Sequence, residues 1–437
     1  MVKQTQHIPS GYKPSPLGII PEDWEVKRLG EVCTFLRNNT LSRNQLNETN
    51  GKVQNVHYGD ILVKYPSILN ARAESIPYVN QEDYKDTLNE FIEDGDVIMA
   101  DTAEDETVGK ACEIINVDSK RILAGLHTML IRPQKGLFAS SFLGYHINSN
   151  SYRRQLNALI QGIKVCSLGK QVIANTFLLV PPLPEQHRIV SLLSLRDIAI
   201  AKQTALIEQL TLRKRGLMQQ LLTGKKRPKG FEGEWKEVRL GDVASINRGG
   251  SPRPIEDYIT QGEGYNWIKI GDVDQDAKYI TSTEEKIIKE GLSKTRFVKR
   301  GDFILSNSMS FGRPYILKID GCIHDGWLVI QEYDQTFNID FLYYILGYDS
   351  TLAQYKSMAA GSGVLNLNKE IVKEVQLRIP TIEEQIAIAS ILINADKEIE
   401  IQKQKLAAMQ EQKKGLMQVL LTGKKRIINH QITHYGN

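Results

Sequence analysis

The feature that most constrains this chain of 437 residues is that its second half repeats its first. Residues 215–227 (RGLMQQLLTGKKR) and 414–426 (KGLMQVLLTGKKR) are identical at eleven of thirteen positions, at an offset of 199. The offset holds back to Phe142 and Phe341, and it has drifted to 211 at Trp24 and Trp235. Each half is therefore a divergent segment of about 150 residues followed by a well-matched segment of about 45.

The repeat predicts two globular domains, 1–180 and 228–379, each followed by a shorter segment, 181–227 and 380–437. A duplication whose ends stay alike while its middles diverge suggests one scaffold that presents two different surfaces. An old duplication without any functional asymmetry would leave the same pattern, so the repeat alone does not separate these two histories.

Both matched segments have the period of a long helix. In the second copy the apolar positions from Ile388 to Leu420 recur at alternating steps of four and three residues, which is typical of a coiled-coil seam. Subtracting the offset gives an equivalent seam from Ile189 to Leu221. Thr381–Glu384 has the form of a capping box at the start of the second helix.

Each half offers one seam of this length, so the two helices are expected to pair with each other, antiparallel if a two-fold axis relates the copies. Gln203 and Gln402 interrupt the seams near the helix midpoints, and Lys214 and Lys413 interrupt them again. In a centred antiparallel pair the two glutamines would meet and fix the register. The alternative is an ordinary polar break in each helix.

The divergent segments have the pattern of α+β domains. The first has apolar strand-like runs that precede a helical stretch, and the second has the same succession. Both then close with a short helix and a strand. The predicted elements are strands at 97–100, 112–115 and 128–132 with a helix at 138–148, strands at 303–305, 315–319 and 327–330 with a helix at 339–348, closing helices at 168–174 and 367–373, and closing strands at 177–180 and 375–379.

Loops rich in Gly, Ser, Asn and Arg lie between the elements of the second domain. Arg, Lys and Asn side chains read base edges in the major groove of DNA, and small residues let the backbone approach phosphates. The candidate DNA-contacting residues there are Arg248, Ser251, Arg253, Lys269, Ser306, Asn307, Ser308, Arg313, Ser362 and Asn366. In the first domain Gln161–Lys164 matches the Gly361–Gly363 loop, which makes Lys164 a candidate. Such loops are also common as plain turns.

Residue sets for catalysis are missing from the sequence. It contains no [DN]-P-P-[FYW] motif for adenine methylation and no glycine-rich phosphate loop. His127 and His324 roughly match between the halves, but no Ser, Cys or carboxylate matches around them, so structural histidines are expected. The pattern favours a chain that is not an enzyme by itself and holds no metal or cofactor.

The cellular setting is also constrained by composition. The four cysteines are scattered without the spacing of zinc ligands, and free thiols suit a reducing cytoplasm. No run approaches the ~18 apolar residues of a membrane span, and the polar N-terminus is unlike a secretory signal. The sequence therefore predicts a cytoplasmic protein without membrane contact.

Positive charge is concentrated in the matched segments. The formal charge is +4 overall, made up of −1 in residues 1–180, +6 in 181–227, −3 in 228–379 and +2 in 380–426. Neutralisation of phosphates dominates affinity for DNA, so the two large domains are poorly equipped to hold DNA unaided. We therefore expect a helper subunit.

Taken together, these motifs resemble the specificity subunits of type I restriction-modification enzymes. The resemblance lies in residues 18–31 (GIIPEDWEVKRLGE), 180–186 (VPPLPEQ) and 235–242 (WKEVRLGD), in the two LLTGKKR segments, and in residues 249–252 (GGSP) and 361–368 (GSGVLNLN). It implies two α/β target-recognition domains in a pseudo-two-fold arrangement, separated by two long antiparallel helices.

The resemblance also implies a division of labour. Each domain would read one half of a two-part target in double-stranded DNA, and the helices would set the spacing. Two modification subunits would supply adenine methylation that depends on S-adenosylmethionine, and restriction subunits would add cleavage driven by ATP with Mg. Two rivals remain at this point: an enzyme with degenerate motifs, and a stand-alone DNA-binding or scaffold protein.

Overall fold

Two compact units make up the chain. The structure, a computed structural model, describes residues 8–83, 90–162, 164–274, 277–307, 311–359, 367–428 and 431–434. Unit 1 comprises Met1–Thr204 with Lys405–Asn437, and unit 2 comprises Ala205–Gln404. Each unit therefore holds one globular domain and one half of each long helix, whereas the predicted division at residues 180, 227 and 379 follows the sequence repeat.

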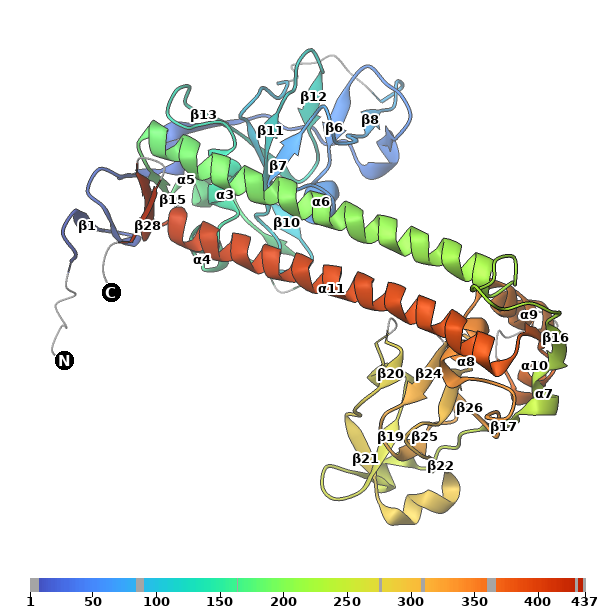
Figure 1. Ribbon diagram of the computed structural model, residues 1–437. Coiled ribbons are helices and arrows are strands. Elements are labelled where there is room, and N and C mark those ends of the chain that lie inside the picture. The colour runs from blue at the N-terminus through green and yellow to red at the C-terminus, as the bar shows by residue number, and fades with distance from the viewer. Residues whose placement is uncertain are drawn as a thin grey trace. The chain divides into compact units, whose positions relative to one another are not determined.

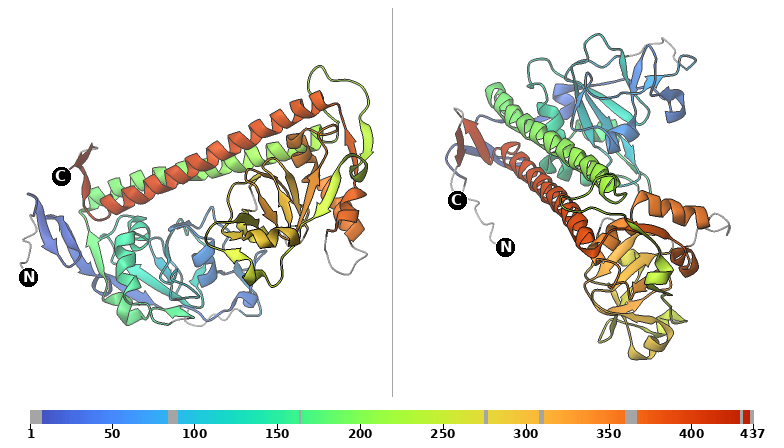
Figure 2. Two further views of the ribbon diagram at one scale, coloured as in Figure 1. Left: turned by 90° about the horizontal axis from the view of Figure 1, so that it is seen from below. Right: turned by 45° about the vertical axis from the view of Figure 1, so that its right-hand side comes forward.

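The long helices are α6 (Leu183–Leu221) and α11 (Ile382–Leu420), and they lie side by side (Figures 1 and 2). In unit 1, Ile189 near the start of α6 shares a core with Leu420 at the end of α11. In unit 2, Ile388 near the start of α11 shares a core with Leu221 at the end of α6. Within each unit the helices are therefore antiparallel, which confirms the predicted pairing.

The predicted seams describe the packed faces of both helices. Every seam position from Ile189 to Leu221 and from Ile388 to Leu420 is buried or half-buried. Gln203 is buried and Gln402 is half-buried. Gln203 belongs to unit 1 and Gln402 to unit 2. A contact between these two glutamines would join the two units, and it stays a prediction.

The domain of unit 1 is built on a five-stranded sheet of order β4-β13-β9-β11-β7, beside a smaller sheet of order β12-β6-β8-β5. Its elements are β1 (Tyr12–Ser15), β2 (Gly18–Pro21), β3 (Glu25–Arg28), α1 (Leu29–Val32), β4 (Cys33–Leu36), β5 (Leu46–Asn47), β6 (Gln54–Val56), α2 (Tyr58–Val63), β7 (Ile68–Asn70), β8 (Tyr78–Val79), β9 (Val97–Ala100), β10 (Thr102–Ala103), β11 (Ala111–Ile115), β12 (Ile122–Ala124), β13 (Thr128–Pro133), α3 (Phe142–Ile147), α4 (Asn150–Asn157), β14 (Cys166–Ser167), α5 (Lys170–Ala174) and β15 (Phe177–Val180), with β28 (Lys425–Ile428) and β29 (Gln431–His434) from the end of the chain.

The domain of unit 2 repeats this plan, with a sheet of order β17-β26-β23-β24-β20 beside one of order β18-β21-β19-β25-β22. Its elements are β16 (Lys236–Arg239), α7 (Leu240–Val243), β17 (Ser245–Arg248), β18 (Ile259–Thr260), β19 (Tyr265–Ile268), β20 (Tyr279–Ile280), β21 (Glu285–Ile287), β22 (Arg296–Val298), β23 (Phe303–Ser306), β24 (Pro314–Leu317), β25 (Gly321–Ile323), β26 (Trp327–Gln331), α8 (Ile339–Leu346), α9 (Asp349–Ala359), α10 (Lys369–Lys373) and β27 (Gln376–Ile379). The α+β class is confirmed in both domains.

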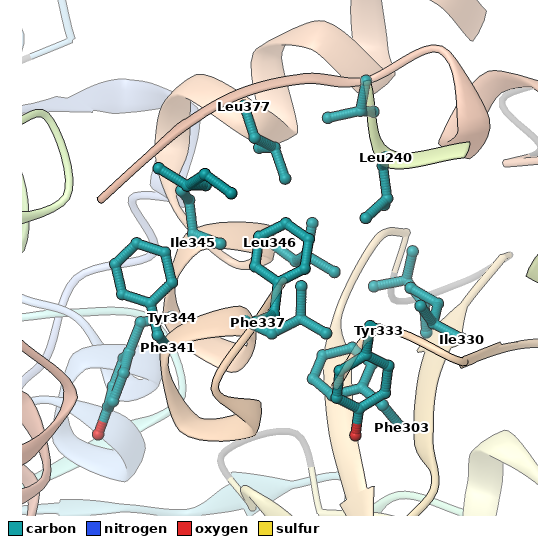
Figure 3. Packing of buried hydrophobic residues seen from close by; sticks show 14 of the residues in the cluster. Leu240, Phe303, Ile330, Tyr333, Phe337, Phe341, Tyr344, Ile345, Leu346 and Leu377 are labelled. Atoms are coloured by element: carbon teal, nitrogen blue, oxygen red, sulfur yellow. The ribbon is translucent and has the colours of Figure 1, made fainter. Parts of the chain in front are cut away.

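The core of unit 2 shows how a domain is attached to the helices. Phe303 of β23 and Ile330 of β26 belong to one apolar cluster with Phe341 and Ile345 of α8 (Figure 3). The same cluster continues to Leu392 of α11. Burying large apolar side chains is the main favourable term in folding. Because the core includes residues of both the domain and the helices, the domain is fixed to the helix pair and is not a loosely tethered module.

Similar contacts in the two units explain why the LLTGKKR segments stay alike. In unit 1 Trp24 lies against Gly423, and its indole N–H donates to Glu185 at 3.0 Å. Arg426 from the LLTGKKR segment forms an ion pair with the same Glu185 at 2.6 Å. In unit 2 Trp235 lies against the other helix-terminating glycine, Gly224. Both glycines have a positive φ, the left-handed backbone that terminates helices.

Candidate nucleic-acid interface

One edge of the central sheet in unit 2 collects the ends of several strands. Strand β26 runs antiparallel to β17 and β23, so its start lies beside the ends of both. The parallel pair β19 and β25 ends at Ile268 and Ile323, and the backbone N–H of His324 donates to the carbonyl of Ile268. The loops that follow β17, β19 and β23 and the turn that precedes β26 therefore meet at one edge.

Asp325, in the turn before β26, is the centre of this edge. Its Oδ1 accepts a hydrogen bond from Ser251 Oγ at 2.9 Å and lies 3.0 Å from His324 Nε2. Its Oδ2 lies 3.8 Å from a guanidinium nitrogen of Arg248 and 3.9 Å from one of Arg253. These distances hold the two arginines near one carboxylate without engaging all their donors. Both remain exposed enough to reach a ligand.

The backbone of Asp325 ties the same loops together. Its carbonyl accepts from Arg248 Nε and from Asn307 Nδ2, each at 2.8 Å. Arg248 ends β17, and Asn307 follows β23. One turn residue thus joins two separate loops, those after β17 and β23, and sequence reasoning missed it. Its only sequence signal is the position between a histidine and a glycine just before a buried strand.

A cleft of about 520 Å³ opens beside this carboxylate. Its base includes the buried Trp267, whose ring meets that of His324 edge-on at 5.8 Å. Lys269 stands on one wall in an ion pair with Glu285 at 2.9 Å. The lining residues are Ser251, Pro252, Arg253, Pro254, Ile255, Glu256, Ile259, Trp267, Lys269, Glu285 and His324. The cleft offers donors, acceptors and an aromatic face within one recess.

The structure brings together four of the predicted residues of the second domain, namely Arg248, Ser251, Arg253 and Lys269. Two others, Ser306 and Asn307, are buried. The Ser306 hydroxyl accepts from the backbone N–H of Arg313 at 3.0 Å. Ser306 and Asn307 therefore hold the loop in place and do not present their side chains to solvent, while the half-buried Arg313 lies at the far end of that loop. The predicted Ser308, Ser362 and Asn366 lie outside the described residues.

Strand register identifies the matching edge of unit 1. Leu36 of β4 pairs with β13 as Asn247 of β17 pairs with β26, so Arg37 holds the place of Arg248. In the second sheets, Val56 pairs with β12 as Ile268 pairs with β25. The next residue is therefore His57 in unit 1 and Lys269 in unit 2. The backbone scaffold is the same, and the side chains on it differ.

The edge in unit 1 carries imidazole, phenol and amide groups. The rings of Tyr58 and His127 meet edge-on at 5.4 Å, and those of His57 and Tyr58 are 4.6 Å apart. His127 Nδ1 lies 3.6 Å from Asp101 Oδ1 and 3.4 Å from Thr102 Oγ1. Burial lowers the pKa of His57, so this imidazole is neutral at neutral pH.

We name these two surfaces the first polar edge and the second polar edge. The first consists of Arg37, Asn38, Asn39, His57, Tyr58, Asp101, Thr102 and His127, and the second of Arg248, Ser251, Arg253, Lys269, His324 and Asp325. The sequence suggested that His127 and His324 are structural. The side chains have partners, yet they are 47% and 41% exposed on the two edges.

Backbone hydrogen bonds connect the segment around Lys164, the predicted candidate of the first domain, to the first polar edge. Lys164 is exposed in the turn closed by the bridge between Gln161 and Ser167. Strand β14 pairs with β10, which starts at Thr102. The backbone N–H of Leu168 donates to the backbone carbonyl of Asp101 at 2.9 Å. In unit 2 the backbone N–H of Leu367 donates in the same way to the carbonyl of Asn307 at 2.8 Å. The segment that follows Lys164 is therefore anchored at Leu168 as the chain of unit 2 is anchored at Leu367.

Two further findings concern the parts of the chain that the structure describes. No group of three or more His, Cys, Asp or Glu side chains there could hold a metal ion. None of the helices among these residues has the length and apolar character needed to cross a membrane.

Comparison with known proteins gives a consistent result. The model of the type I restriction modification DNA specificity domain matches residues 21–212 and again residues 232–411. The MjaVIII specificity subunit of a type I restriction enzyme from Methanocaldococcus jannaschii is 24% identical over 94% of this chain and 95% of its own length. A provisionally named specificity subunit of the same organism, MjaX, is 25% identical over 95% of this chain and 97% of its own length.

Solved structures show the same fold. A chain from a study of complex assembly and conformational transition in a type I R-M system superposes with a TM-score of 0.62, at 20% identity, over 92% of this chain and 99% of that one. The S subunit of a type I restriction-modification system from M. genitalium gives a TM-score of 0.51, at 14% identity, over 91% and 96%. The two matches to the family domain together cover most of this chain, and the chain therefore belongs to the type I restriction-modification DNA specificity family.

Proposed function

We propose that this chain is the DNA-specificity subunit of a type I restriction-modification complex, and that each domain reads one half of a two-part target. The observation that carries the proposal is the pair of polar edges, which occupy equivalent places on a repeated scaffold but differ in chemistry. Phosphate contacts position a protein on DNA, whereas contacts to base edges specify the sequence. Two edges with different donors and acceptors therefore suit two different half-targets.

The side chains suggest what each edge reads. An arginine that presents two donors pairs best with guanine, and asparagine pairs with adenine. Arg248 and Arg253 on the second polar edge therefore favour guanine in one half-target. Asn38 and His127 on the first polar edge favour a different base pattern in the other.

Charge supports the requirement for partners. The two globular segments have formal charges of −1 and −3, and DNA affinity depends on neutralised phosphates. We propose that two modification subunits hold the DNA and carry S-adenosylmethionine, and that restriction subunits carry ATP and Mg. We place the assembly in the cytoplasm, with its DNA.

The long helices would set the distance between the half-targets. Each has 39 residues, which at ~1.5 Å per residue is about 58 Å. One turn of DNA is ~34–36 Å. A spacer of this length suits half-targets that are separated by between one and about two turns.

Purification tests the proposal against its two rivals. The chain expressed with a type I modification subunit from its own source should co-purify with that subunit and methylate adenine in DNA. The chain alone should neither methylate nor cut. Methyl transfer by the isolated chain would favour the degenerate-enzyme alternative. Tight, sequence-specific DNA binding by the isolated chain, with no affinity for a modification subunit, would favour the stand-alone alternative.

A further inference from the structure

A cluster of three side chains joins the domain of unit 1 to both long helices. Tyr145 on α3 donates its hydroxyl hydrogen to Asp197 Oδ2 on α6 at 2.7 Å. The ammonium group of Lys413 on α11 lies 2.5 Å from Asp197 Oδ1 and 5.3 Å from the centroid of the Tyr145 ring. One carboxylate therefore binds the domain with one oxygen and the opposite helix with the other.

Unit 2 contains the same cluster with the helices exchanged. Tyr344 on α8 donates to Asp396 Oδ2 on α11 at 2.5 Å. Lys214 on α6 lies 2.5 Å from Asp396 Oδ1 and 5.7 Å from the Tyr344 ring centroid. In Figure 3 the Tyr344 hydroxyl points away from the apolar cluster that its ring borders. We name these sets the first cluster (Tyr145, Asp197, Lys413) and the second cluster (Tyr344, Asp396, Lys214).

All three positions repeat at the offset of 199. Tyr145 corresponds to Tyr344, Asp197 to Asp396, and Lys214 to Lys413. The helices that carry the tyrosines are only partly alike, since FLGYHI in α3 and the aligned FLYYIL in α8 share three of six residues. The same contacts are therefore made in both units although the surrounding domains have diverged.

Both lysines occupy seam positions that an apolar side chain would otherwise fill. A charged residue in such a seam lowers stability but specifies register, because only one alignment of the helices gives it a partner. The Lys413 and Lys214 side chains are only 20% and 24% exposed, so an unpaired ammonium group would be costly there. Sliding one helix by a turn, ~5.4 Å, would break the ion pair and leave the domain bonded to one helix alone.

We propose that the two clusters make the gap between the half-targets strict, by fixing the helix register and the seat of each domain at the same carboxylate. Tyr145, Asp197, Lys413 and their counterparts are positioning residues, since none of them is on a polar edge. This inference rests on the proposed function, because a gap exists only if the two domains read separate half-targets.

The test uses the full complex with its modification subunits and a library of targets in which both half-targets are kept and the gap varies. The K214M and K413M double variant removes both ammonium groups but keeps chain length at the seam. We expect methylation of targets with one base pair more or less to rise at least about tenfold relative to the preferred gap. The half-target sequences should stay the same.

A matched control lies next to Lys214. Arg213 also forms an ion pair between the helices, with Glu398 at 2.5 Å, but both side chains are exposed. R213M should leave the gap preference unchanged, since exposed ion pairs contribute little. Equal broadening by R213M would show that any loss of charge between the helices has this effect, and would overturn the proposal.

Two more variants guard against simple misfolding. The exchange D197K with K413D, made together with D396K and K214D, restores opposite charges between the helices but takes the acceptor carboxylate away from both tyrosines. It should therefore narrow the gap again, to the breadth that the pair Y145F and Y344F gives. The double variant Y145F and Y344F removes only the hydrogen bonds that the tyrosines donate to Asp197 and Asp396. It should broaden the gap less than the K214M and K413M double variant does. A strict gap in all folded variants would refute the clusters' role and leave the proposed function intact. A wild-type complex that methylates no two-part target would instead refute the proposed function itself.

Discussion

The two globular domains share a scaffold and differ on one edge of it. Both have a five-stranded sheet with the same strand order, beside a second sheet with the same parallel pair. The second polar edge is organised by a carboxylate that collects arginines, whereas the first is a cluster of imidazole and phenol rings. The strands are fixed by burial, but the loops at this edge face solvent and can change freely. The difference teaches that one fold can carry two specificities in one chain.

The caps of the equivalent helices α3 and α8 also differ between the domains. In unit 1 the buried Glu113 of β11 accepts from the backbone N–H groups of Ser141 and Gly144 at the start of α3. In unit 2 Asn338 caps α8 by accepting from the N–H groups of Asp340 and Phe341. An ionisable cap and a neutral cap therefore do the same work. The cap of α3 can therefore respond to pH, whereas the amide cap of α8 cannot.

Lengthening both long helices is the broadest test of whether each domain reads its half-target independently of the other. Inserting one heptad after Gln203 and one after Gln402 keeps both seams in phase and lengthens the pair by ~10 Å, about three base pairs. We expect both half-target sequences to survive while the gap between them widens by that amount. Methylated-motif mapping of the reconstituted complex measures it. Full activity at the original gap would show that the helices do not set the spacing.

Removing the carboxylate of Asp325 should damage one half-target alone. Asp325→Ala removes the carboxylate from Ser251, His324 and both nearby arginines at once, although Arg248 keeps its bond to the backbone carbonyl. We expect discrimination in that half to fall about a hundredfold, the size of one or two good base contacts at ~1–3 kcal/mol each. Competition binding against single-base variants of both halves measures it. The exposed Asp334, which follows the other end of β26, gives the control Asp334→Asn.

Arg253→Ala should have a smaller effect in the same half. The Arg253 side chain is 83% exposed, so its loss costs the fold little, and one bidentate contact is worth ~1–3 kcal/mol. Arg253→Lys should fail to restore the preference, because a lysine cannot make the paired contact. If these variants changed both half-targets equally, the assignment of one domain to one half would be wrong.

The counterpart in the first domain is Arg37→Ala. Arg37 holds the place of Arg248 in the strand register and is exposed. We expect about a tenfold loss confined to the half-target that Asp325→Ala leaves untouched, measured in the same competition assay. A loss in the same half as Asp325→Ala would break the comparison between the two edges.

The smallest expected effect concerns stability and pH. Burial raises the pKa of Glu113 from the usual 4.5 to about 7, although backbone hydrogen bonds oppose the shift. The folded state therefore favours the protonated form, and this contribution to stability is present below pH 4.5 and lost as the pH rises through about 7. In Glu113→Gln the thermal midpoint should change less between pH 5 and pH 8 than in the wild type. The exposed Glu104→Gln should behave like the wild type; an unchanged pH response in Glu113→Gln would contradict this account.

Burial explains which parts could be predicted from sequence. Runs such as Val97–Ala100 and Trp327–Gln331 are buried along nearly their whole length, so their apolar composition marks them as strands. The strands of the second sheets are short or polar, as in Gln54–Val56 and Glu285–Ile287, and no periodicity reveals them. The long helices are predicted well because their seams repeat over many turns.

The functional residues that sequence reasoning missed depend on contacts between distant segments. Asp325 matters because the loops after β17 and β23 meet at it, and no local pattern records that meeting. Lys214 and Lys413 are visible as breaks in the seams, but their tyrosine partners come from the globular domains. The break in a seam can be seen in the sequence, but the tyrosine that contacts the lysine there is known only from the fold.

The central claim is that this chain reads two separate half-targets, and the most direct measurement is the motif of methylated adenine in cells. DNA from cells that express this chain with its modification subunits should be sequenced for methylated positions, beside cells without the chain. The account predicts one two-part motif with a fixed gap that appears only with the chain. A single continuous motif, or the same methylation in cells without the chain, would contradict it.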